Sequence, residues 1–134
     1  ARASEGELYP HQPLAIVMGQ RDIPEDVLIR QHPGGFEHVT DHNIKELLES
    51  LGEREIRSVY VEGGATLASA FLAEHLVDEL HITMGPMLLG GPNLAVTDLG
   101  VSTMAEAHPL DIRGIDSLGD DIVVTARPTR ERSR

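Results

Sequence analysis

Apolar segments of two different periods alternate along this chain, and their order limits the folds open to it. In residues 43–52, Ile and Leu recur at the i, i+3, i+4 and i+7 positions that form one apolar stripe of a helix. Residues 65–76 repeat this pattern with smaller side chains. Short apolar runs without the helical period occur before, between and after them, at residues 13–19, 57–63 and 79–86. The order strand, helix, strand, helix, strand predicts an α/β fold with a mostly parallel sheet.

Turn and cap signals place the ends of these elements. Asn43 lies three residues before Glu46, as in a capping box, and Gly52 is predicted to end the first helix. Residues 36–40 alternate and predict one more short strand. In the closing segment, 110–128, two alternating runs flank the sequence SLGDD, which is typical of a hairpin. We therefore expect a single domain over residues 1–134 that closes with an antiparallel hairpin.

Charge and composition limit the possible partners. The chain carries 22 acidic side chains against 11 Lys and Arg, a formal net charge of −11, and 3% aromatic residues. Such a field repels polyanions, and few rings are present to stack on bases, so we expect no nucleic-acid partner. The basic tail, residues 127–134, is interpreted as a solvated terminus. The chain has no apolar run of about 18 residues, no signal-peptide pattern and no cysteine, which predicts a cytoplasmic protein that does not contact membranes.

Two adjacent glycines, Gly63 and Gly64, lie where a predicted strand turns into the second predicted helix. In a parallel sheet, ligands bind at such turns, and the N–H groups at the start of a helix favour phosphate. Thr66 would add a hydroxyl donor, and Glu62 would accept hydrogen bonds from a neutral polyol or an amine. The alternative is that the glycines only form a tight corner and that Glu62 is a solvated acid at the rim. The glycine pattern alone leaves both interpretations open.

Other residue patterns predict no metal site and no nucleophile. His38 and His42 have the four-residue spacing of a helical metal site, but they fall across a predicted strand end and a helix cap. Adjacent acids point to opposite faces of a strand, so they form no catalytic dyad. The serines lack a nucleophile-elbow motif. We therefore expect no metal and assign no catalytic residue.

The segment VYVEGGATLASAFLAEHLVDELHITMGPMLLGG, residues 59–91, resembles the reductase domain of bacterial riboflavin biosynthesis. That domain is the C-terminal half of a bifunctional deaminase-reductase and also occurs as stand-alone paralogues. The resemblance implies a three-layer α/β/α, dihydrofolate-reductase-like fold that uses NADPH. It further implies hydride transfer to a ribosylamino-pyrimidine phosphate, whose sugar opens to an imine at C1′ and becomes a ribitylamino group. Catalysis would then come mainly from positioning.

The same resemblance assigns the site residues. Gly63, Gly64, Ala65, Thr66 and Leu67 match the turn that binds the pyrophosphate, and the Gly63–Gly64 peptide is expected to be cis. Glu62 matches the acid that faces the sugar of the substrate.

After the first strand, Gly19, Gln20 and Arg21 occupy the place where such folds meet the adenosine ribose. Arg21 would pair with a 2′-phosphate and so prefer NADPH to NADH, whereas the alternative is an ordinary surface arginine.

The chain also departs from the family. Domains of the family begin with a strand that carries a Ser-Leu-Asp-Gly-like turn, followed by a Gly-x-x-Thr-type segment. Neither motif occurs in these residues. We therefore expect a reductase-like domain that lacks its first strands, and a homodimer, because members of the family usually pair. The alternatives are a non-catalytic NADP(H)-binding or regulatory module, a reductase of another pyrimidine or pteridine, and a structural subunit. The partners expected for the first hypothesis are a small-molecule substrate and NADPH.

Overall fold

A computed structural model describes residues 7–129 of the chain, which divide into two compact units. The first unit is Ala1–Arg57 and the second is Ser58–Arg134. The interpretations made for residues 1–6 and for the arginines at 130, 132 and 134 lie outside the described residues. Within 7–129, no helix has the length and hydropathy of a membrane span.

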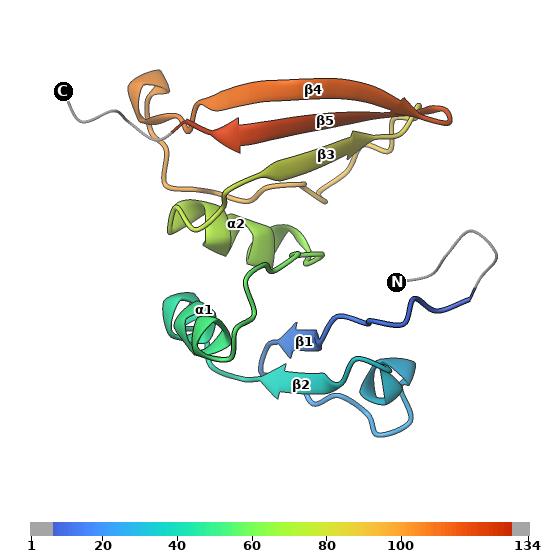
Figure 1. Cartoon of the computed structure of the whole chain (residues 1–134). Coiled ribbons are helices and arrows are strands. Elements are labelled where there is room, and N and C mark those ends of the chain that lie inside the picture. Colours follow the sequence, from blue (N-terminus) through green and yellow to red (C-terminus); the bar gives the residue numbers. More distant parts are fainter. Residues whose placement is uncertain (1–6, 130–134) are drawn as a thin grey trace. The chain divides into compact units, whose positions relative to one another are not determined.

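The first unit contains one parallel pair of strands, β1 (Ala15–Met18) and β2 (Phe36–Val39), as Figure 1 shows. Ala15 pairs with Phe36 and Met18 with Val39. A short 3-10 helix, η1 (Leu28–Gln31), lies in the connection between the strands. Both strands are confirmed, β1 within the apolar run of residues 13–19 and β2 within the alternating residues 36–40.

The helix α1 (Ile44–Glu53) follows β2 and confirms the first helical prediction. The Asn43 side chain accepts a hydrogen bond from the Glu46 N–H at 3.2 Å, and Leu51 is almost fully buried. The prediction that Gly52 ends the helix was wrong, because the helix continues through it. The chain leaves α1 at Glu55 (φ 63°) in a Schellman arrangement, with the N–H of Ile56 donating to Leu51 O at 3.0 Å.

The second unit contains a helix and a three-stranded sheet (Figure 1). Its elements are α2 (Ala65–Ala73), β3 (Leu80–Met84), η2 (Met104–Glu106), β4 (Leu110–Leu118) and β5 (Asp121–Pro128). The strand order is β3-β5-β4, and both pairings are antiparallel. The predicted hairpin is confirmed, with Gly119 (φ 63°) in its turn. Buried Ser69 of α2 accepts a hydrogen bond from the Thr97 N–H at 2.8 Å, which fixes the long β3–β4 connection beside the helix.

Two predictions about the sheet were wrong. Residues 57–63 are not a strand, and Tyr60 is 75% exposed. An apolar run becomes a strand only where a neighbour completes its hydrogen bonds, and this run has no ladder partner within 7–129. The strand pairing is also not mostly parallel: among residues 7–129, β3 and β4 both pair antiparallel with β5, and β1 with β2 is the single parallel pair. The three-layer arrangement stays a prediction.

Candidate functional site

The predicted phosphate turn lies at the start of α2. Gly64 is the N-cap residue, with extended backbone (φ −67°, ψ 176°), and no described side chain caps the helix. Its carbonyl accepts the first helical hydrogen bond, from the Ala68 N–H at 3.1 Å. The N–H groups of Ala65, Thr66 and Leu67 therefore precede the first intrahelical bond, where a helix has donors to offer. Together with the positive end of the helix dipole, they form an arrangement suited to an anion.

The two glycines of the turn differ in their surroundings. A Cβ placed on Gly63 would lie 2.6 Å from Leu67 Cδ2 and 2.7 Å from Leu67 Cβ, so Gly63 permits the turn to close on the helix. A Cβ placed on Gly64 would meet no heavy atom within 4 Å. The space that a side chain of Gly64 would fill is therefore open, and phosphate binding at this turn stays a prediction. The interpretation that the glycines only form a tight corner suits Gly63. The interpretation that a glycine lets a ligand approach the backbone closely suits Gly64.

The expected cis peptide between Gly63 and Gly64 was wrong, because no cis peptide bond occurs in the described residues. A cis bond without proline costs about 2.5–4 kcal/mol, and the extended conformation at Gly64 leads into the helix without it. Glu62 and Thr66 are both exposed beside this turn, whereas Leu67 is half-buried and packs over Gly63. The side chain of Leu67 thus supports the turn, and only its N–H faces the predicted ligand.

The second predicted group lies at the carboxyl end of β1. Gly19 (φ 141°) follows the strand, and its N–H donates to Val39 O of β2 at 3.0 Å. His38 Nε2 is 2.7 Å from Gly19 O. Gly19 and exposed Arg21 line an open hollow of about 410 Å³. The carboxyl end of a parallel strand is where α/β sheets bind ligands, and the contact of Gly19 and Arg21 with an adenosine ribose stays a prediction.

The structure brings each predicted group together within its own unit. Glu62 and the five residues of the α2 turn belong to the second unit, whereas Gly19 and Arg21 belong to the first. The contact from His38 to Gly19 was not foreseen. The only signal in the sequence was a histidine within a short alternating strand.

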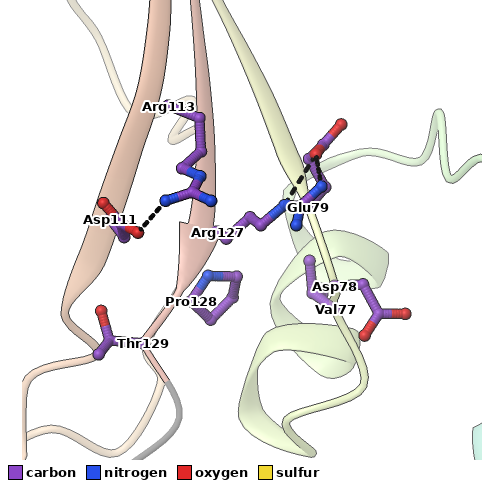
Figure 2. A pocket seen from close by; sticks show the side chains of 8 residues that line it. All are labelled: Val77, Asp78, Glu79, Asp111, Arg113, Arg127, Pro128 and Thr129. Atoms are coloured by element: carbon purple, nitrogen blue, oxygen red, sulfur yellow. Dashed lines mark hydrogen bonds and ion pairs between the residues drawn. The ribbon is translucent and has the colours of Figure 1, made fainter.

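A polar hollow of about 520 Å³ in the second unit was also not foreseen (Figure 2). Arg127 of β5 donates to Glu79 at 3.0 Å, and His81 Nε2 is 3.0 Å from the other oxygen of that carboxylate. Arg113 donates to Asp111 at 2.8 Å. The hydrogen bond from Arg127 holds the pKa of Glu79 below its ordinary value. Both arginines are paired with carboxylates and are more than half exposed, so we interpret this hollow as a set of surface ion pairs, one within β4 and one between β5 and Glu79.

Comparison with known proteins gives one consistent family. Residues 1–124 match the RibD C-terminal domain. The riboflavin biosynthesis protein RibD of Mycobacterium tuberculosis is 35% identical over 125 residues, which cover 93% of this chain and 36% of that protein. A 2,5-diamino-6-ribosylamino-4(3H)-pyrimidinone 5′-phosphate reductase of Archaeoglobus fulgidus is 36% identical over 87 residues, 65% of this chain and 38% of that protein.

A solved structure agrees with these relatives. RibD of Acinetobacter baumannii superposes with a TM-score of 0.74 at 26% identity, over 85% of this chain and 37% of that one. The chain therefore spans little more than a third of the length of these relatives.

Proposed function

Because the chain belongs to the RibD C-terminal domain family, we propose that it is an NADPH-dependent reductase of a ribosylamino-pyrimidine phosphate in riboflavin biosynthesis. The observation that carries this proposal is the open space in front of the uncapped start of α2, where Gly64 leaves room for a phosphate. The related reductase of Archaeoglobus fulgidus, whose name specifies a ribosylamino-pyrimidinone phosphate, supports the substrate class.

Different residues of the chain would bind different parts of NADPH and of the substrate. The N–H groups of the first turn of α2 would hold the pyrophosphate, with the Thr66 hydroxyl as a further donor. Arg21 would pair with the 2′-phosphate of the adenosine ribose. The Glu62 carboxylate would accept hydrogen bonds from the sugar hydroxyls of the substrate and so orient C1′. The chemistry that NADPH supplies when bound is a hydride for the C1′ imine.

Turnover is the direct test of the proposal. We expect loss of nicotinamide absorbance when the chain, NADPH and the ribosylamino-pyrimidine phosphate are mixed. Glu62→Gln should raise the KM for the substrate by about ten- to a hundredfold, because hydrogen bonds to a charged group contribute about 1.5–3 kcal/mol. The Kd for NADPH should stay the same, because Glu62 is assigned to the sugar of the substrate. Glu74→Gln, an exposed acid at the end of α2, serves as the matched control.

Two other outcomes of this test would change the proposed function. Saturable NADPH binding without turnover would favour the alternative, a non-catalytic NADP(H)-binding or regulatory module. Turnover only with a different pyrimidine or a pteridine would keep the reductase and change its substrate.

We also propose that the chain forms a homodimer through one face of the β3-β5-β4 sheet. By the strand register, five exposed apolar side chains share this face, namely Ile82, Met84, Ile112, Ile115 and Ile122. A contiguous exposed apolar face of this kind favours association.

Sedimentation of the wild type should show a dimer, and Ile115→Glu should weaken it by at least about a hundredfold, because the interface would bury an unpaired charge. Thr83→Glu, on the opposite face, should leave the dimer unchanged. A wild type that sediments at the monomer mass of 14.6 kDa would contradict this proposal.

A further inference from the structure

We propose that His38 and Arg30 are positioning residues that hold the loop of residues 19–24 ready for the 2′-phosphate of NADPH. This inference rests on the proposed nucleotide binding and adds the residues that would set its selectivity. The loop leaves the carboxyl end of β1 and carries Arg21. Neither His38 nor Arg30 is proposed to touch the ligand.

His38 holds the first residue of the loop. It lies on β2, paired with Val17 of β1, and its Nε2 is 2.7 Å from Gly19 O. The carbonyl oxygen can only accept, so Nε2 carries the hydrogen of this bond. The Gly19 N–H also donates to β2, at Val39 O. Both polar backbone groups of Gly19 are thus fixed to the neighbouring strand, in a conformation (φ 141°) that favours glycine.

Arg30 holds the other end of the loop from η1. Its Nε lies 3.0 Å from Pro24 O and 3.2 Å from Ile23 O, and its Nη2 donates to Ile23 O at 2.6 Å. The guanidinium also lies over the ring of Phe36, 5.5 Å from its centroid. One side chain therefore ties the last two residues of the loop to the first residue of β2.

Between these two anchors, the Arg21 side chain is exposed at the hollow and makes no hydrogen bond or ion pair with any residue of 7–129. A loop that is anchored at both ends loses less conformational freedom on binding an anion than a mobile loop, so an arginine within it binds the anion more tightly. Three features of the loop suit a phosphate: its ends are anchored, the Arg21 guanidinium is exposed, and it lies beside an open hollow, which the Asp22 carboxylate also lines. The bonds from His38 and Arg30 would thereby favour nucleotides that carry a 2′-phosphate.

The test compares 2′,5′-ADP with 5′-ADP, which lacks the 2′-phosphate, by calorimetric titration of the full chain. His38→Leu removes the donor, and we expect about three- to tenfold weaker binding of 2′,5′-ADP, the range that the net contribution of one hydrogen bond predicts. Binding of 5′-ADP should change much less. His38→Gln, whose amide can still donate, should restore most of the affinity. Arg30→Met should act like His38→Leu, and His42→Leu, an exposed histidine in another segment, is the matched control.

A second readout does not depend on nucleotide. Amide hydrogen exchange at Gly19, whose N–H donates to Val39 O, should be faster in His38→Leu than in the wild type and the His42→Leu control.

Equal binding of 2′,5′-ADP by all variants, with unchanged exchange, would overturn the positioning role while leaving the proposed function standing. A wild type that binds neither nucleotide would instead overturn both. If His38→Leu does not fold, weaker binding of 2′,5′-ADP by Arg30→Met than by wild type still supports the inference, and equal binding contradicts it.

Discussion

Replacing Gly64 by valine should abolish NADPH binding while leaving the fold intact. The Cβ of the valine would enter space that holds no heavy atom within 4 Å outside Gly64 and its two neighbours, so we expect the fold to accept it. The backbone of Gly64 (φ −67°, ψ 176°) is one that valine adopts readily. The same side chain would occupy the place from which a phosphate reaches the N–H groups of α2. Losing two charge-assisted hydrogen bonds would weaken NADPH binding by at least about a hundredfold.

The measurement is a titration of NADPH, with NADH beside it, followed by nicotinamide fluorescence, together with thermal unfolding of each variant. Gly63→Ala provides the contrast, because its methyl group would meet Leu67 Cβ at 2.7 Å and force the turn to shift. We expect it to destabilise the chain by about 1–3 kcal/mol. Gly64→Val should change stability by less than about 1 kcal/mol. If Gly64→Val binds NADPH like the wild type, the turn is only a corner and the proposed cofactor site is wrong.

Periodicity predicted the two helices and the closing hairpin, because each was determined by its own residues, but it also predicted a strand at residues 57–63 that does not form. The stripe that includes Leu51, the cap at Asn43 and the turn at Gly119 are all signals within about ten residues of the elements they define. The pairing of strands was predicted poorly. Whether β3 runs parallel or antiparallel to its neighbour depends on β5, about 40 residues further along the chain, and no local pattern carries that information.

The candidate site shows the same division. The sequence pointed to Gly63 and Gly64, but only the structure separates the glycine that packs against Leu67 from the one that faces open space. His38 escaped prediction for a related reason. Its partner is a backbone carbonyl 19 residues away. Every residue has such a carbonyl, so the types of residue in the sequence do not indicate this partner.

Truncating Leu51 should have the largest effect on stability among single aliphatic substitutions in the first unit. Leu51 is 1% exposed and is the largest fully buried side chain among the described residues. Leu51→Ala should lower the free energy of unfolding by about 2–5 kcal/mol, through the lost burial and the cavity left behind.

The matched control for this prediction is Leu88→Ala. The same atoms are removed there from a residue that is fully exposed, at 103%, and the change should stay within about 0.5 kcal/mol. Urea unfolding followed by circular dichroism measures both variants. Because α1 follows directly on β2, which carries His38, Leu51→Ala should also speed amide exchange at Gly19, whose N–H donates to Val39 O of β2. Equal stability of the two variants would show that the apolar stripe of α1 is not packed in a core. In that case α1 would not stabilise β2, to which the loop is anchored.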